Sequence, residues 1–108
     1  MRAERLTDLE IRNKKPAAKP YKLYDGKGLF LLIGPNTKQW RLRFYLDGKE
    51  GLYAIGRYGD AADEYTLSKA RVEAAQARAL VKQGINPVSE RQRLKQENLE
   101  ATRAAKLE

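Results

Sequence analysis

The 108-residue chain contains no cysteine and no histidine. Without thiols it forms no disulfide and no thiolate metal site, which fits a reducing compartment. Without imidazoles, Ser-His and Cys-His catalysis and ordinary zinc coordination are excluded. No apolar run approaches the roughly 18 residues that a membrane span needs, and no apolar stretch follows the charged N-terminus as in a secretory signal. We therefore expect a cytoplasmic chain with no membrane contact, no catalytic constellation, and no metal ion, cofactor or small-molecule substrate.

Acidic residues are also scarce relative to basic ones. The chain carries 22 Lys and Arg against 14 Asp and Glu, a formal charge of +8 with a pI of about 9.8. Residues 1–60 hold 13 basic and 7 acidic side chains, whereas residues 61–86 and 87–108 each have a net charge of only +1. Such an excess is an argument about partners, and it favours a polyanion. Nucleic acid is the first candidate and an anionic membrane surface the second.

The most regular pattern lies in this basic part, over residues 39–46, which alternate strictly between two kinds of side chain. Alternate residues of a strand point to opposite faces of the sheet. One face would carry Trp40, Leu42, Phe44 and Leu46, and the other Gln39, Arg41, Arg43 and Tyr45. We expect the first set, Trp40 included, to face a core. Arg41 and Arg43 would then either bind a polyanion or simply keep the outer face soluble.

Short apolar or alternating runs between turn residues predict strands at 21–24, 29–33, 39–46 and 52–58. Asp47-Gly48 is a strong hairpin-turn signal between the last two. Apolar residues at helical spacing then begin at Leu67, with Thr66 as the N-cap and Gly84 at the end. Thr7 could cap a short N-terminal turn, and Asn86-Pro87 starts a second, mostly polar helix. The expected fold is α+β: a small antiparallel sheet of three to four strands packed on one helix, followed by a C-terminal helix. Residues 1–86 would form the domain and residues 87–108 a helical connector.

Several further side chains are candidates for contacting a polyanion. In addition to Arg41, Arg43 and Tyr45, the predicted DNA-binding residues are Lys22, Tyr24, Lys38, Lys49, Lys14 and Lys15. Asp25-Gly26-Lys27-Gly28 lacks the spacing of a phosphate-binding loop and is interpreted as a turn. Phe30 and Leu32 would point outward if their neighbours face the helix, so they would need cover, which residues 1–15 could provide.

The order of short matches along residues 5–92 resembles the N-terminal arm-type DNA-binding domain of phage and genomic-island integrases, which are tyrosine recombinases. The matching pieces are Leu6-Thr7-Asp8, Ile11-Arg12-Asn13, Lys15-Pro16, Tyr21-Lys22-Leu23, Asp25-Gly26, Gly28-Leu29, Trp40-Arg41, Arg43-Phe44, Gly48-Lys49, Ile55-Gly56, Tyr58, Leu67, Ala70-Arg71, Ala77-Arg78 and Gly84-Ile85-Asn86-Pro87. The stretch 58–65 departs from the family pattern and is longer.

The resemblance implies a three-stranded sheet on the major groove of arm sites, with a helix behind it and with Arg41, Arg43 and Tyr45 at the DNA. It implies sequence-specific binding of double-stranded DNA beside other integrase protomers. The parent would be a prophage or genomic-island recombinase whose catalytic residues lie outside this chain. Two alternatives are a protein-interaction adaptor whose basic sheet face binds an acidic partner, and an RNA-binding module that stacks bases on Tyr24 and Tyr45.

Overall fold

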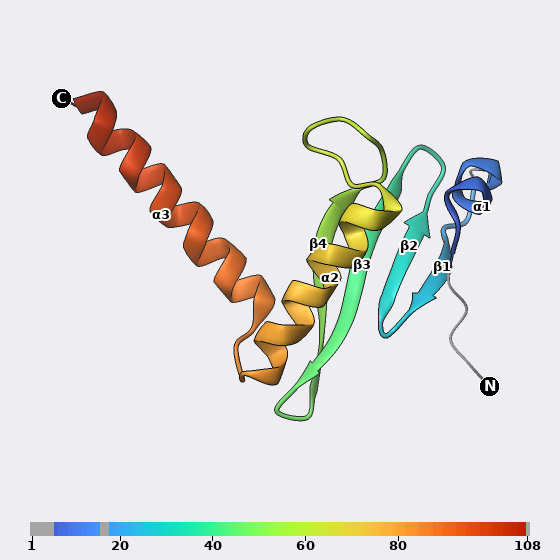
Figure 1. Ribbon diagram of the computed structural model, residues 1–108, viewed down its shortest axis with the longest axis horizontal. Helices are drawn as coiled ribbons and strands as arrows, with labels where there is room; N and C mark the ends of the chain where they lie inside the picture. The colour runs from blue at the N-terminus through green and yellow to red at the C-terminus, as the bar shows by residue number, and fades with distance from the viewer. Residues whose placement is uncertain (1–5, 16–17, 108) are drawn as a thin grey trace.

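The computed structural model describes residues 6–15 and 18–107, with side chains up to Leu99. Its elements are α1 (Asp8–Asn13), β1 (Tyr21–Gly26), β2 (Leu29–Ile33), β3 (Lys38–Leu46), β4 (Lys49–Arg57), α2 (Leu67–Lys82) and α3 (Pro87–Leu107). The four strands form one antiparallel sheet in the order β1-β2-β3-β4 (Figure 1). The α+β class is thereby confirmed, with four strands in the sheet. No helix within the described ranges has the length and apolar character needed to cross a membrane.

The β3–β4 hairpin turns at the predicted dipeptide. Asp47 and Gly48 have φ angles of 54° and 77°, and positive φ at both central residues suits a tight two-residue hairpin. The pairing runs right up to this turn, where Leu46 faces Lys49. Strand β4 therefore starts at Lys49, three residues before the predicted start at Leu52, because pairing with β3 outweighs the weak strand preference of the residues next to the turn.

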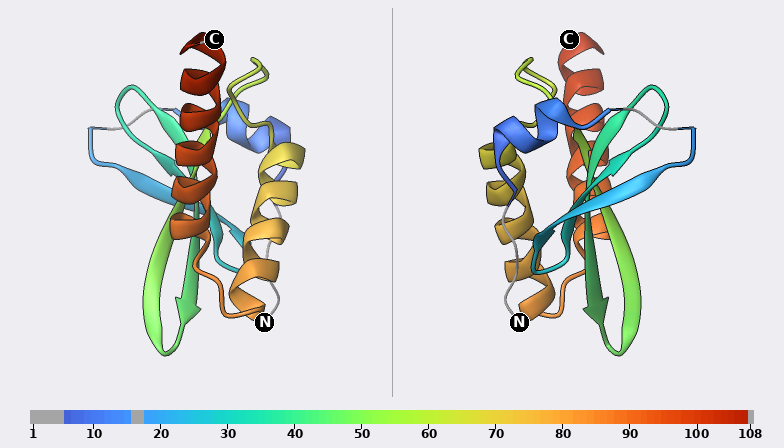
Figure 2. Two further views of the ribbon diagram at one scale, coloured as in Figure 1. Left: turned by 90° about the vertical axis from the view of Figure 1, so that its left-hand side faces the viewer. Right: turned by 90° about the vertical axis from the view of Figure 1, so that its right-hand side faces the viewer.

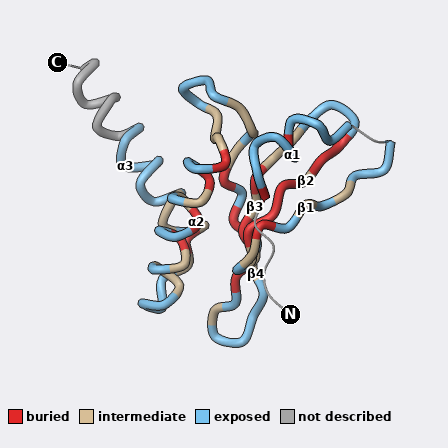
Figure 3. Tube along the Cα trace, turned by 45° about the vertical axis from the view of Figure 1, so that its right-hand side comes forward, coloured by how far each residue is buried: buried red, intermediate tan, exposed pale blue. Residues whose placement is uncertain are grey.

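The core lies between one face of the sheet and α2. Trp40 and Leu42 from β3 are fully buried, and Ala70 and Ala74 of α2 are buried against the sheet. Alanine lets the helix approach closely, and in Figure 3 the buried segments gather in the sheet and on α2. The predicted cap is present, since the Thr66 hydroxyl accepts a hydrogen bond from the Lys69 backbone N–H at 3.2 Å.

Helix α1 and the residues before it close one end of the same core. Leu6 and Ile11 are buried with the core residues, and the Thr7 hydroxyl caps α1 through the Glu10 N–H, as predicted. In Figure 2, α1 and α2 lie on the same side of the sheet. The opposite side of β1, β2 and β3 carries no helix in the part of the chain that the structure describes.

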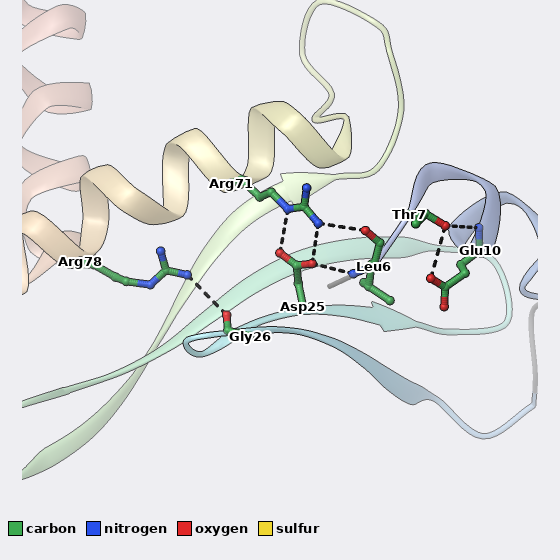
Figure 4. Close-up of polar contacts among 7 residues, drawn as sticks. All are labelled: Leu6, Thr7, Glu10, Asp25, Gly26, Arg71 and Arg78. Atoms are coloured by element: carbon green, nitrogen blue, oxygen red, sulfur yellow. Dashed lines mark hydrogen bonds and ion pairs between the residues drawn. The ribbon is translucent and has the colours of Figure 1, made fainter. Parts of the chain in front are cut away.

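An ion pair fastens α2 to the end of β1 (Figure 4). The Asp25 carboxylate, 7% exposed, accepts hydrogen bonds from Arg71 Nε at 2.9 Å and from Arg71 Nη2 at 2.8 Å. Asp25 also accepts from the Leu6 backbone N–H at 2.8 Å, and Arg71 Nη2 donates to the Leu6 carbonyl at 2.9 Å. This Asp25–Arg71 pair joins three segments that are far apart in the sequence, and sequence patterns did not predict it.

The longer connection between β4 and α2 turns back onto the sheet. Tyr58 and Tyr65 form an isolated bridge, and the Tyr65 N–H donates to the Arg57 carbonyl at 2.7 Å. The indole Nε1 of Trp40 donates to the Tyr65 carbonyl at 2.9 Å. The polar atom of the largest core side chain is therefore satisfied by this connection, as burial requires.

Helix α3 leaves the sheet along the β4 edge, and Figure 1 shows it extending away from the rest of the molecule. Asn86 caps it as predicted, accepting from the Val88 N–H at 2.9 Å. Near its base, the Arg91 guanidinium donates to the carbonyls of Ala54 and Ile55 on β4. Arg91 also lies over the Tyr53 ring, 5.2 Å from its centroid. These contacts anchor the helix to the edge strand.

Candidate nucleic-acid interface

The side of the sheet opposite α2 is called the outer face. Strand register assigns to it Lys22 and Tyr24 of β1, Phe30 and Leu32 of β2, Gln39, Arg41, Arg43 and Tyr45 of β3, and Glu50, Leu52, Ala54 and Arg57 of β4. Four of these side chains are basic and one is acidic. Tyr24 is 55% exposed and Tyr45 62% exposed, as the alternation predicted. The outer face is therefore a basic surface with two accessible phenol rings.

Phe30 lies at the centre of the outer face, where it is only 2% exposed. The Tyr24 ring lies 5.7 Å from it between centroids, and Lys22 Nζ lies 5.1 Å from its centroid. Among the described residues 6–15, Leu6 and Ile11 pack into the core on the other side of the sheet and not over Phe30, while residues 1–5 of the expected cover lie outside the described residues. The cross-strand neighbours of Phe30 shield it from solvent. One of them is Arg41, which faces Phe30 across the β2–β3 pair.

The two arginines of β3 are held in different ways. Arg41 Nη2 donates to Gln39 Oε1 at 3.2 Å, an arrangement between two side chains of the same strand face. Arg43 Nε lies 3.0 Å from the carboxylate oxygen Oε2 of Glu50 on β4. Both side chains are partly exposed, so each guanidinium is steadied by a neighbour while part of it stays accessible.

The predicted lysines are more scattered than the arginines. Lys22 is exposed on the outer face, and Lys49 is exposed at the β3–β4 turn. Lys38 lies on the same side of β3 as the residues that face the core, so it is not on the outer face. Its Nζ donates a hydrogen bond to the Ile11 carbonyl at 2.9 Å, which holds α1 against the sheet. Lys14 and Lys15 are exposed after α1. The structure thus gathers Arg41, Arg43, Tyr45, Lys22 and Tyr24 on one face, and leaves the other lysines away from it.

Sequence reasoning missed two charged residues of the outer face. Glu50 and Arg57 lie on β4, and they reach this face through the register of the β3–β4 hairpin. The hairpin turn at Asp47-Gly48 was the available signal, because counting outward from it pairs Tyr45 with Glu50. No group of three or more carboxylates in the described part of the chain is placed to hold a metal ion.

Comparison with known proteins agrees with this geometry. Residues 6–94 match the family described as the arm DNA-binding domain. The prophage integrase IntZ of Escherichia coli strain K12 is 46% identical over 88 residues, which are 79% of this chain and 21% of that protein. The integrase of Shigella phage Sf6 is 42% identical over 84 residues, 77% of this chain and 21% of that protein. The integrase of Enterobacteria phage P4 is 34% identical over 86 residues, 77% of this chain and 19% of that protein.

The chain spans about a fifth of the length of these integrases. The family match, by contrast, extends over most of the chain, from Leu6, two residues before α1, into the first turns of α3. It includes every strand of the outer face and the helix packed behind it. The chain therefore belongs to the arm DNA-binding domain family.

Proposed function

We propose that the outer face enters the major groove of arm-site DNA. The observation that carries the proposal is the placement of Arg41, Arg43 and Tyr45 on a sheet face that no described helix covers, with Lys22 and Tyr24 beside them. The major groove is about 12 Å wide, and neighbouring strands lie about 4.8 Å apart. Two or three strands can therefore fit, and β3 with its neighbours would meet the bases.

The arginines and the lysine would act in different ways. Arg41 and Arg43 can each donate two hydrogen bonds to O6 and N7 of a guanine. Lys22 at the border of the face suits a phosphate oxygen, which positions the domain without reading sequence. Lys38 is engaged with α1, and its predicted DNA contact has less support than that of Lys22.

We further propose that the chain is the N-terminal module of a tyrosine-type site-specific recombinase. The supporting observation is that the matched integrases are about five times longer than the matched segment. Residues 1–86 would be the DNA-binding unit and α3 the start of a connector, acting in the bacterial cytoplasm with other integrase protomers on the same DNA. The relatives from Escherichia coli and from an Enterobacteria phage support that setting.

The test is duplex binding by the chain, its Arg41→Ala/Arg43→Ala variant and a Lys82→Ala/Arg93→Ala control on α2 and α3. Both variants remove two positive charges, and the control residues are exposed on helices rather than on the outer face. Fluorescence anisotropy with labelled attachment-region duplexes, at several salt concentrations, gives affinity and its salt dependence. Each base-reading arginine should be worth about 1–3 kcal/mol, and each lost phosphate contact should reduce the salt slope by about 0.9.

Only the outer-face variant should lose sequence preference, while the control should keep it. Equal affinity of the outer-face variant and the parent chain would show that another surface binds the DNA. If the outer face instead serves an acidic protein partner, the chain should bind that partner in the absence of DNA, and the Arg41→Ala/Arg43→Ala variant should lose this binding.

A further inference from the structure

Glu50 is the one acidic side chain among the outer-face residues defined above. It lies directly opposite Tyr45 in the β3–β4 register and diagonally next to Arg43. A carboxylate on a surface that approaches phosphates is repelled by all of them. Glu50 therefore lowers the general attraction of this face for DNA, which calls for a compensating role.

Stability does not supply that role. The Arg43 and Glu50 side chains are 36% and 48% exposed, and ion pairs at such sites add little to folding. The contact is an ion pair without hydrogen-bond alignment, since Arg43 Nε has no hydrogen-bond partner within the described residues. An ionised carboxylate offers about four acceptor sites, so Glu50 keeps most of its capacity to accept from another donor.

We propose that Arg43 and Glu50 together read one G·C base pair, an inference that rests on the proposed placement of the outer face in the major groove. Arg43 donates to O6 and N7 of the guanine, and Glu50 accepts from the N4 amino group of the cytosine. Guanine O6 and cytosine N4 are neighbours on the major-groove edge of one base pair. The 3.0 Å separation of the two side chains matches a pair of groups that must act side by side.

The carboxylate also discriminates by repulsion. An ionised Glu50 can only accept hydrogen bonds, so thymine O4 or guanine O6 in place of the cytosine amine would set two acceptors against each other. Arg43 alone would favour guanine but would still bind phosphates and other acceptors. Adding Glu50 turns a general cationic contact into one that is favourable at a single base pair.

The experiment enriches duplexes from a randomised pool with the parent chain and with its Glu50→Gln variant, and compares base preference at each position. Glutamine keeps the size of the side chain but can also donate, so it no longer rejects acceptors. Asp63→Asn is the matched control, because it makes the same acid-to-amide change at an exposed position in the connection between β4 and α2. Urea unfolding of each variant shows that the comparison is made on folded protein.

With Glu50→Gln we expect discrimination at one G·C position to fall about 5- to 150-fold, which corresponds to one good base contact of about 1–3 kcal/mol. Affinity for unrelated duplexes should rise. Asp63→Asn should leave every base preference in place. An unchanged preference profile in Glu50→Gln, or a change confined to A·T positions, would overturn the assignment of Glu50 while leaving the proposed function intact. If the parent chain enriches no duplex at all, the proposed function fails and this inference fails with it.

Discussion

Replacing Arg71 with methionine isolates the contribution of the Asp25–Arg71 pair to the stability of the fold. Methionine keeps much of the apolar stem of arginine and removes only the guanidinium. The change deletes the hydrogen bonds to Asp25 at 2.9 and 2.8 Å and the bond to the Leu6 carbonyl at 2.9 Å. Asp25, which is 7% exposed in the parent chain, would keep the Leu6 N–H as a donor.

The magnitude follows from the burial of the two partners. Removing one member of a fully buried ion pair costs about 3–5 kcal/mol, because the other charge is left without its partner. The Arg71 side chain is 31% exposed, so water can reach part of the vacated space, and we expect about 2–4 kcal/mol. The hydrogen bond to Asp25 raises the pKa of Arg71 above its ordinary value. When folding raises the pKa of a cation, its contribution to stability is lost only when the pH rises above its unfolded-state pKa. The contribution of Arg71 is therefore constant around neutral pH.

Urea unfolding at neutral pH, followed by the fluorescence of Trp40, measures this loss, since Trp40 is the single tryptophan and is fully buried. Arg93→Met is the control, because Arg93 makes its ion pairs on the exposed surface of α3 and its loss should leave the midpoint close to that of the parent chain. In a double-mutant cycle, Asp25→Ala and Arg71→Met should cost less together than the sum of the two alone. A loss below about 1 kcal/mol in Arg71→Met, or strict additivity with Asp25→Ala, would refute the reasoning.

Two further predictions concern the inner face and the β1–β2 turn. Burial, together with the hydrogen bond that the Tyr53 hydroxyl donates to Glu73 at 2.8 Å, raises the pKa of Tyr53 to about 12. The folded chain then holds this proton more tightly than the unfolded chain, so the contribution of Tyr53 to the free energy of unfolding should be constant below pH 10 and fall by about 2–3 kcal/mol between pH 10 and 12. In an ultraviolet titration of the phenols, Tyr53→Phe should remove the last component and Tyr45→Phe should keep it; a late component that survives in Tyr53→Phe contradicts the assignment. At Gly28, φ is +89° and an added Cβ would lie 2.3 Å from the Arg43 carbonyl oxygen, so Gly28→Ala should cost about 2–3 kcal/mol in urea unfolding. Gly48→Ala, with φ at +77° and nothing within 4 Å of the added atom, should cost about 1 kcal/mol; equal losses at the two glycines would show that the close approach at Gly28 is unimportant.

Features that depend on neighbours in the sequence could be predicted. The alternation of residues 39–46 placed Trp40 in the core and Tyr45 outside, and the structure confirms both. The caps Thr66 and Asn86 were predicted because a capping side chain bonds to a backbone N–H two or three residues later. The hairpin at Asp47-Gly48 was predicted from its dipeptide in the same way. The fold class follows from these local signals, because few arrangements bury one apolar sheet face and one alanine-rich helix.

Features that join distant segments could not be predicted. Asp25 and Arg71 are 46 residues apart. Arg91 bonds to Ile55 and Ala54 of β4, which precede it by 36 and 37 residues. Nothing in local spacing distinguishes such partners from the many other charged residues in the chain. Phe30 shows the same difficulty, because its position on the outer face followed from alternation, whereas the Tyr24 and Lys22 side chains beside it come from another strand, β1. The DNA contacts assigned to individual residues remain predictions for the experiments above.

The anchoring of α3 by Arg91 has a mechanical consequence. The 16 residues that follow Arg91, up to Leu107, rise by about 24 Å along the helix axis at 1.5 Å per residue. Over that length a tilt of about 10° at the base displaces the far end by about 4 Å, more than the ~3.4 Å that separates neighbouring base pairs in duplex DNA. Three hydrogen bonds of one guanidinium, to the carbonyls of Ala54 and Ile55 and to the Tyr65 hydroxyl, hold that base against the sheet. In a longer integrase, the Arg91 side chain, together with the buried Pro87 and with Val88 packed on the core, would therefore set how accurately a segment after this helix is aligned to the DNA.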